Sequence, residues 1–227
     1  MSEKILTIRS GVLASIPTCQ LSDAFEFFRL KEAVVRTIEL DEATVSARVA
    51  RFEELSLLEI QKDSSIPIEA KDLIYSRKLM SVIGLDSSAK TPINSNAPVV
   101  GAGGITVTYA ACPPGTGPSL HAHQKTFETF TVLRGKFEFS LNDDGSQKVI
   151  LEPFDVISVP PKVNRCFRCI ADEEGLLQVV ISGGVHDLND IDMAPSVGEK
   201  LDGFGPKIKA RFEEAGFTFE AHKNGVD

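Results

Sequence analysis

The sequence contains little histidine and little cysteine, and it has no long apolar run. Its 227 residues include four histidines and four cysteines. No stretch reaches the roughly 18 consecutive apolar residues of a transmembrane helix, so we expect no membrane span. Basic residues are in the minority, with 24 lysines and arginines against 32 aspartates and glutamates, which gives a net charge of −8. This negative charge argues against nucleic acid and anionic membrane surfaces as partners.

A continuous apolar segment is also missing from residues 1–19. Their sequence, MSEKILTIRSGVLASIPTC, places threonine, arginine, serine and glycine between the apolar positions. We therefore expect no signal peptide and a cytoplasmic protein. The hydrophobic content of 42% and the charged content of 25% are ordinary for a globular protein, and the length suits one domain or two small ones.

The cysteines give only weak support for a zinc or redox site. Cys166 and Cys169 form a CxxC pair, which could be a redox pair or half of a zinc site. No second CxxC is present, and the pair lies in RCFRCIA, which has the character of a strand. Residues three apart in a strand face opposite sides of the sheet, so we interpret both cysteines as structural.

The few histidines are concentrated in one stretch. Residues 115–135 read GTGPSLHAHQKTFETFTVLRG, and they hold His121 and His123, followed by Glu128. Side chains two apart on a strand point to the same face, so an HxH pair presents two imidazoles side by side. Two imidazoles and a carboxylate with open positions suit a divalent metal such as non-haem Fe(II). These three residues are the predicted metal ligands.

Alternating apolar residues in the second half of the chain predict an all-β fold. In residues 104–113, GITVTYAACP, every second side chain is apolar or aromatic from Ile105 onward. TFETFTVL and KFEFSL are predicted to form a hairpin at Arg134-Gly135. Turn residues at regular intervals separate four further predicted strands, KVIL, DVISV, RCFRCI and LLQVVIS. Many short strands at this spacing indicate a β-sandwich or barrel.

Glycines frame the stretch that holds the predicted ligands and complete a family motif. Gly115 and Gly135 flank the histidines and Glu128 in the pattern G(X)5HXH(X)4E(X)6G. This pattern resembles the first conserved motif of the cupin superfamily at every position. The resemblance covers roughly residues 100–185 and implies a cupin-type double-stranded β-helix, or jelly-roll barrel. It also implies a homodimer, because cupins commonly pair through their sheets.

The second cupin motif is matched only in part. The resemblance places it at residues 151–169, LEPFDVISVPPKVNRCFRC, where Asp155 and the VISVPP run fit. Lys162 stands where a glycine is common, and Arg165 stands where the family usually places its last histidine. Arginine has no lone pair to donate, so Arg165 cannot be a ligand and the usual fourth ligand is absent.

The rest of the chain is predicted to flank the barrel. We expect an N-terminal extension over residues 1–95 that packs on the barrel, a cupin barrel over residues 96–185, and a C-terminal segment over residues 186–227. No second HxH occurs before residue 100, so we do not expect two cupin domains in tandem. His186 and His222 lie outside the motifs, and we interpret them as surface or structural residues.

Local patterns predict further elements in the flanking segments. Ser22 is a candidate cap for a short helix. Alternation in residues 45–49 predicts a strand, and another is expected within residues 71–84. PKIKARFEEA predicts a short C-terminal helix over residues 206–215, with proline at its start, glycine after its end, and an apolar face made of Ile208, Phe212 and Ala215.

Arg165 leaves three interpretations of the site open. His121, His123 and Glu128 are enough for a catalytic metal with open positions, and Arg165 would then bind an anionic group of the substrate. Alternatively, Arg165 pairs with Glu128 and its charge repels a dication, which leaves a metal-free pocket. In the third interpretation the motif is only the packed interior of a barrel. Because burying so many polar groups is costly, a working cavity is favoured.

The resemblance and these residues together predict a metal-dependent, dioxygenase-like oxidoreductase that acts on a small, possibly anionic organic molecule. Fe, Mn or Ni would be the metal, and Glu128 and Arg165 would be the catalytic residues. Arg165 would also line the substrate pocket with Phe130 and Phe167, which strand alternation places on the same faces. The alternatives are a metal-free small-molecule-binding cupin and a metal-free isomerase or lyase. Pairing of Arg165 with Glu128 would favour the metal-free functions.

Overall fold

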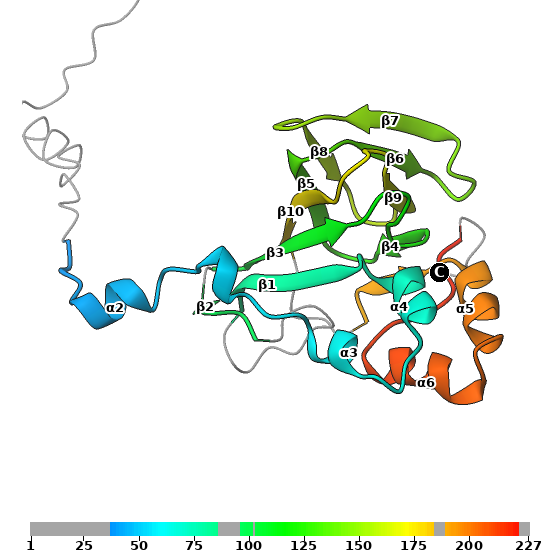
Figure 1. Ribbon diagram of the computed structural model, residues 1–227, viewed down its shortest axis with the longest axis horizontal. Coiled ribbons are helices and arrows are strands. Elements are labelled where there is room, and N and C mark those ends of the chain that lie inside the picture. The colour runs from blue at the N-terminus through cyan, green and yellow to red at the C-terminus, as the bar shows by residue number, and fades with distance from the viewer. Residues whose placement is uncertain (1–36, 86–95, 102, 184–188, 223–227) are drawn as a thin grey trace, which may run out of the picture. The chain divides into compact units, whose positions relative to one another are not determined.

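The computed structural model describes residues 37–85, 96–101, 103–183 and 189–222 (Figure 1). The chain divides into two units, Met1–Leu40 and Asp41–Asp227, and every described helix and strand belongs to the second unit. The helix predicted after Ser22 lies outside the described residues. In the described part of the chain, no helix is long and apolar enough to cross a membrane.

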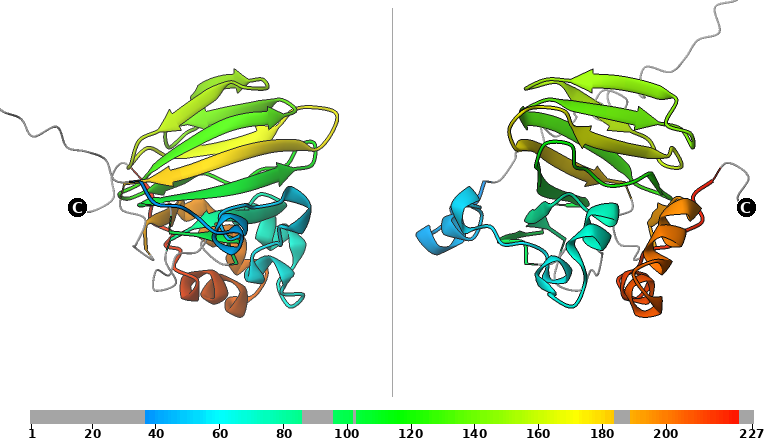
Figure 2. Two further views of the ribbon diagram at one scale, coloured as in Figure 1. Left: turned by 90° about the vertical axis from the view of Figure 1, so that its left-hand side faces the viewer. Right: turned by 45° about the vertical axis from the view of Figure 1, so that its right-hand side comes forward.

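Two β-sheets form the body of the second unit (Figure 2). One sheet has six strands in the order β2-β1-β3-β10-β5-β8, and the other has five in the order β11-β4-β9-β6-β7. This arrangement confirms the predicted all-β jelly-roll fold. The strands are β1 (Lys78–Gly84), β2 (Val99–Val100), β3 (Ile105–Cys112), β4 (His121–His123), β5 (Phe127–Arg134), β6 (Phe137–Leu141), β7 (Gln147–Leu151), β8 (Val156–Val159), β9 (Arg165–Cys169), β10 (Gly175–Ser182) and β11 (Ile191–Met193).

Short helices precede β1 and follow β11 (Figure 1). The predicted C-terminal helix is confirmed, because α6 begins at Pro206 and Gly216 follows its end with φ +98°. Phe212 is fully buried, and Ile208 and Ala215 pack beside it against the core, as the apolar face predicts. The helices are α2 (Glu42–Ser46), the 3-10 helix η1 (Phe52–Glu54), α3 (Glu59–Lys62), α4 (Ile68–Ile74), α5 (Pro195–Asp202) and α6 (Pro206–Glu214).

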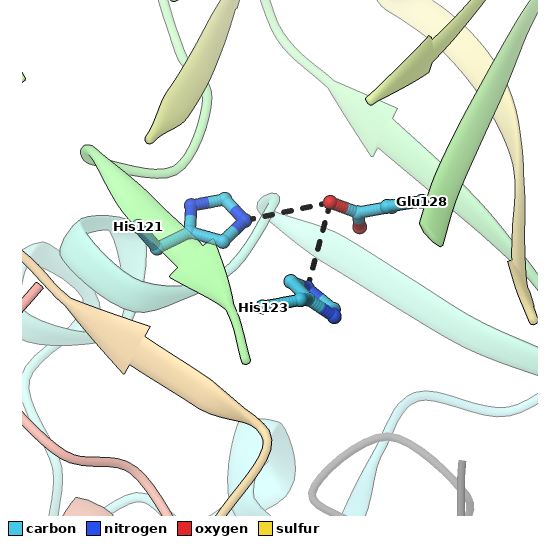
Figure 3. Close-up of side chains that lie close together, drawn as sticks. All are labelled: His121, His123 and Glu128. Atoms are coloured by element: carbon cyan, nitrogen blue, oxygen red, sulfur yellow. Dashed lines mark ion pairs between the residues drawn. The ribbon is translucent and has the colours of Figure 1, made fainter. Parts of the chain in front are cut away.

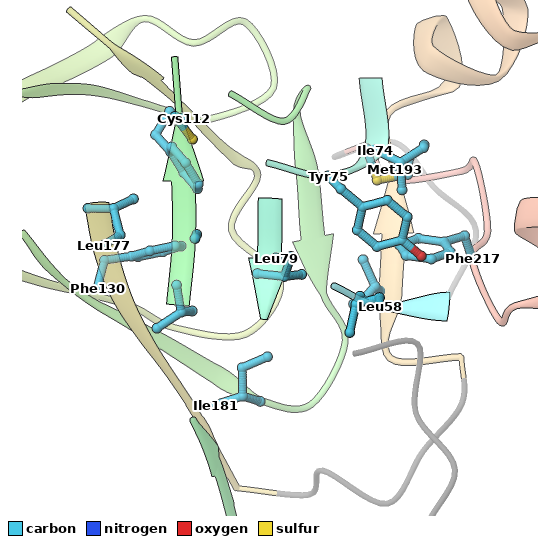
Figure 4. Packing of buried hydrophobic residues seen from close by; sticks show 14 of the residues in the cluster. Leu58, Ile74, Tyr75, Leu79, Cys112, Phe130, Leu177, Ile181, Met193 and Phe217 are labelled. Atoms are coloured by element: carbon cyan, nitrogen blue, oxygen red, sulfur yellow. The ribbon is translucent and has the colours of Figure 1, made fainter. Parts of the chain in front are cut away.

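Phenylalanines from both sheets fill the space between them. Phe130 of β5 meets Phe139 of β6 and Phe167 of β9, with ring centroids 5.0 Å and 5.2 Å apart. Tilted and edge-on contacts of this kind stabilise a core beyond the effect of burial alone. The same core continues outside the barrel, where Tyr75 packs edge-on against Phe217 at 5.4 Å (Figure 4). The segments that precede and follow the barrel in the sequence therefore pack against it.

The predicted hairpin at Arg134-Gly135 is wrong. β5 pairs with β10 and β8 in the six-stranded sheet, whereas β6 pairs with β7 and β9 in the five-stranded sheet. Gly135, with φ +85°, carries the chain from one sheet to the other. A Cβ at this position would lie 2.9 Å from the Cα of Gly175, so both the conformation and the space require glycine. Glycine suits a hairpin equally well, and the sequence pattern could not tell the two turns apart.

The strand predicted over residues 45–49 is also wrong. Residues Glu42–Ser46 form the helix α2, whose start is capped by Asp41, which accepts a hydrogen bond from the backbone N–H of Thr44 at 2.8 Å. Val45 and Val49 are exposed, so their alternation does not mark a buried face. The strand expected within residues 71–84 is present but begins only at Lys78, because the residues before it complete α4.

Phe154 adopts a backbone conformation that favours glycine. Its φ is +76°, and its side chain is 81% exposed. Because a side chain at positive φ crowds the backbone, we expect Phe154→Gly to be more stable than Phe154→Ala by about 0.5–1 kcal/mol. Urea unfolding of the two variants measures this difference. Equal midpoints would show that the turn carries no strain.

Candidate metal site

The three predicted ligands come together between the two sheets. His121 and His123 are the first and last residues of β4 in the five-stranded sheet, and Glu128 lies on β5 in the six-stranded sheet. All three side chains are buried. One potential ligand atom from each lies within 4.8 Å of the other two. The HxH spacing on a strand thus places both imidazoles on the face that meets the carboxylate.

One oxygen of Glu128 faces both imidazoles (Figure 3). Its Oε2 lies 3.6 Å from Nε2 of His121 and 3.5 Å from Nε2 of His123. These distances exceed the roughly 2.7–3.2 Å of a good hydrogen bond. Two ligand atoms that share an ion at about 2.1 Å are expected roughly 3.0–3.5 Å apart. The observed separations therefore suit a shared ion better than direct hydrogen bonds.

The other nitrogen of each imidazole faces an oxygen atom. Nδ1 of His121 lies 2.8 Å from the backbone oxygen of Ser119. Nδ1 of His123 lies 2.7 Å from the hydroxyl oxygen of Thr126 and 3.0 Å from a carboxylate oxygen of Asp190. A carbonyl or carboxylate oxygen can only accept, so each Nδ1 carries the proton and each Nε2 presents its lone pair to the site. This is the arrangement found around histidines that bind metals.

Asp190 is a site residue that the sequence did not reveal. It precedes β11, which pairs with β4, and it also accepts a hydrogen bond from the backbone N–H of Lys125 at 2.7 Å. Its position 67 residues after His123 places it outside both motifs. The only available signal was an aspartate before alternating apolar and acidic residues, and this is too common a pattern to single out one residue.

Burial and electrostatics favour a neutral imidazole and an ionised carboxylate. Burial lowers the pKa of His123, and the charge of Arg165 lowers it further. Burial alone would raise the pKa of Glu128, but its favourable polar interactions, including the charge of Arg165, outweigh this effect and hold that pKa below its usual range. Metals bind neutral imidazole and ionised carboxylate, so at neutral pH both groups are already in the form of ligands.

Arg165 is fully buried and pairs with Glu128. Its Nε donates to Oε2 of Glu128 at 2.9 Å, and its Nη1 donates to the carbonyl of Val163 at 3.0 Å. Burial lowers the pKa of Arg165 and the negative charge of Glu128 opposes this, but a guanidinium keeps its proton in proteins. The side chain of Arg165 thus points toward Glu128, and this pairing is the arrangement expected for the metal-free functions.

A small cavity opens beside the histidines. Its volume is about 50 Å³, enough for only a few water-sized groups. Phe130 and Phe167 line it, as expected for the substrate pocket, but Arg165 is not among the lining residues. The walls also include residues from outside both motifs. The lining is Ile74, Tyr75, Ser76, Leu79, Thr108, Ala110, Pro118, His121, His123, Glu128, Phe130, Phe167, Val179, Ile191 and Phe217.

The remaining histidines and cysteines do not form a second site among the residues described. His222 is exposed, and His186 lies outside the described residues. Cys166 and Cys169 are free thiols, half-buried and buried respectively. Within the described ranges, His121, His123 and Glu128 are the one group of histidine, cysteine and acidic side chains that could hold a metal ion.

Comparisons with known proteins identify one family. The sequence model of the Cupin domain matches residues 108–182. The search of curated proteins found no match. Among solved structures, the DMSP lyases RdDddP and RnDddQII match with 18% identity and a TM-score of 0.38 over 48% of this chain and 49% of theirs. The match thus spans about half the length of the lyase chain.

Two further solved structures show a similar partial likeness. A cupin protein from Bacteroides fragilis is 24% identical, with a TM-score of 0.33 over 36% of this chain and 68% of its own. A predicted oxalate decarboxylase from Thermotoga maritima is 22% identical, with a TM-score of 0.32 over 34% of this chain and 65% of its own. The assignment depends on the match to the Cupin domain and on the two-sheet arrangement of the strands within the matched residues. Residues 108–182, which supply most strands of the two sheets, therefore form a cupin domain.

Proposed function

We propose that this cupin is a metal-dependent enzyme of the oxygenase class that acts on a small organic molecule. His121, His123 and Glu128 would hold the ion. The observation that carries the proposal is the orientation of the two imidazoles, whose Nδ1 atoms face oxygen acceptors while both Nε2 atoms face the Glu128 carboxylate. Two histidines and one carboxylate suit Fe(II), and Mn(II) and Ni(II) are accepted by similar donors.

The donor set fits such an ion in spite of Arg165. A carboxylate has two oxygens and about four lone-pair positions, so Glu128 can accept from Arg165 and still bind a metal. When bound, the ion would polarise a substrate oxygen and, if redox-active, activate dioxygen. Arg165 would hold the carboxylate in place, and Asp190 with Thr126 would orient His123.

The apolar wall of the cavity defines what the substrate can be. Phe130, Phe167 and Val179 contribute carbon surface close to the candidate ligands. The cavity of about 50 Å³ accommodates only a few heavy atoms without rearrangement. We infer a compact substrate with one apolar side and one polar group, and the apolar wall would exclude excess water from the reacting atoms.

A metal-free function is the second candidate, and the ion pair between Arg165 and Glu128 favours it. The pair is buried and 2.9 Å long, and a guanidinium at this distance weakens the attraction of the site for a dication. In that case the site would bind a small molecule or catalyse an isomerase or lyase reaction, with His121 or Glu128 transferring a proton.

Metal content distinguishes the two candidates. We expect the purified protein, or protein reconstituted with Fe(II), Mn(II) or Ni(II), to hold close to one ion per chain by elemental analysis. The double variant His121→Ala/His123→Ala should hold none, because it lacks two of three ligands. His222→Ala is the matched control, since it removes an exposed histidine outside the site and should retain the ion. Wild-type protein that binds none of the three metals would overturn the metal-dependent function and leave the metal-free one.

A further inference from the structure

Tyr75 has a buried hydroxyl group that no residue of the described structure satisfies. Its Oη is one of three buried side-chain polar atoms without a hydrogen-bond partner in the described ranges, together with Oδ1 of Asn164 and Nη2 of Arg165. The side chain is 3% exposed. A buried hydroxyl without a partner is costly, and phenylalanine would fill the same space without that cost. The hydroxyl therefore calls for a functional explanation.

The position of Tyr75 supplies that explanation. It is the residue that ends α4 and leads into β1. Its ring packs against Phe217 with centroids 5.4 Å apart (Figure 4), and the ring of Phe212 lies 6.3 Å away. Neither Asn164 nor Arg165 lines the cavity beside the candidate metal ligands, but Tyr75 does. Tyr75 is thus a wall residue of this cavity that comes from a segment outside the Cupin domain match.

We propose that the hydroxyl of Tyr75 anchors the substrate by donating a hydrogen bond to a carbonyl or carboxylate oxygen. The inference deepens the proposed function, since it assigns the substrate class of the same cavity. Burial raises the pKa of Tyr75 far above its ordinary value, so the phenol keeps its proton and acts as a donor. With the cavity volume of about 50 Å³, the substrate class is a carbonyl compound or carboxylic acid of a few heavy atoms.

Binding of small probes to wild type and Tyr75→Phe tests the anchor. Acetone and acetate carry the proposed acceptor, and isobutene has the shape of acetone without the oxygen. We expect Tyr75→Phe to bind acetone or acetate roughly three- to tenfold more weakly, which is the effect of one lost hydrogen bond. Its affinity for isobutene should be unchanged. Equal affinity of both proteins for acetone and for acetate would overturn the proposal.

A spectroscopic readout on the wild type keeps the test independent of the variant's folding. The chain has two tyrosines, so in tyrosine-labelled protein the NMR signals of Tyr75 are identified by their absence from Tyr75→Phe. Acetone or acetate should shift the hydroxyl and ring signals of Tyr75, and isobutene should leave the hydroxyl signal in place. No hydroxyl shift with either oxygen probe would refute the anchor.

The two proposals fail separately. Probe binding is measured on the protein both with and without reconstituted metal. If no metal binds but Tyr75 still discriminates acetone from isobutene, the metal-dependent function is wrong and the anchor stands. If metal binds and Tyr75→Phe loses no affinity for either oxygen probe, the anchor is wrong and the metal site stands.

Discussion

Replacing Arg165 with leucine is expected to lower the free energy of unfolding of the metal-free protein by about 3–5 kcal/mol. Arg165 is fully buried, and it donates to a Glu128 carboxylate that is itself buried. Removing the guanidinium leaves an ionised carboxylate in a low-dielectric interior without its strongest partner. Urea unfolding of the metal-free protein at neutral pH measures the loss.

A second change should recover most of this stability. In Arg165→Leu/Glu128→Gln both charges of the pair are removed, so no unpaired carboxylate is left at position 128 and the double variant should be more stable than Arg165→Leu alone. Lys148→Leu is the control for an ordinary ion pair, because Lys148 and Glu138 pair at 2.8 Å with side chains that are 57% and 32% exposed. That change should cost less than about 1 kcal/mol. A loss of similar size for Arg165→Leu would mean that the buried pair contributes no more than a surface pair.

The dependence on pH gives an independent check of the Arg165 variant. The pKa of Glu128 is lowered in the folded wild type, so its ionised form stabilises the fold above the unfolded value of about 4.3. This stabilisation is lost as the pH falls below about 4.3 and approaches the pKa of Glu128 in the folded protein. The difference in stability between wild type and Arg165→Leu should therefore narrow on acidification. A difference that stays constant down to pH 3 would assign the destabilisation to lost packing.

The sequence was sufficient to predict that the three candidate ligands lie close together, because a strand imposes a fixed two-residue period. His121 and His123 had to share a face, and the alternation in β5 placed Glu128 on a buried face as well. The periodicity that predicted strands from β3 to β10 has the same physical origin. The short alternation of apolar residues at 45–49 predicted a strand wrongly. There Asp41 caps a helix, α2, through a hydrogen bond with its first turn.

Contacts between distant segments could not be read from the sequence. Asp190 reaches His123 because β11 pairs with β4, and Tyr75 reaches the cavity because the segment before β1 is built onto the barrel. Neither residue belongs to a pattern of fixed spacing. Strand pairing and side-chain packing select them, and both depend on the complete fold. The same limitation explains the wrong hairpin, since a glycine turn does not specify which sheet the next strand joins.

Replacing Arg165 with histidine is expected to raise the metal affinity of the site by about 100-fold or more. In the β4–β9 pair, position 165 lies directly opposite His121. Side chains of directly opposite residues point to the same face of a sheet, with Cβ atoms about 5 Å apart. An imidazole at position 165 would therefore approach the existing ligands. A structural four-ligand zinc site binds with about 10–16 kcal/mol, so one added ligand contributes on the order of 3 kcal/mol.

Arg165→Gln is the matched control for this gain. Glutamine also removes the positive charge but adds no imidazole, so any improvement it shows measures relief of repulsion alone. Competition with a chelating dye gives the affinities of wild type and both variants for Mn(II) and Ni(II). If the histidine variant binds no more tightly than the glutamine variant, the side chain at position 165 does not reach the ion.

The same substitution should make folding depend on metal. Without an ion, Arg165→His loses the guanidinium that stabilises the Glu128 carboxylate, so its melting temperature should fall below that of the wild type. At a free metal concentration 100 times the dissociation constant, binding to the folded state restores about 2.7 kcal/mol. The arginine of the natural sequence thus stabilises the site without an ion, whereas a histidine would require one. A melting temperature of Arg165→His that responds to Mn(II) no more than the wild type's would show that the ion pair and the ion do not compete for Glu128.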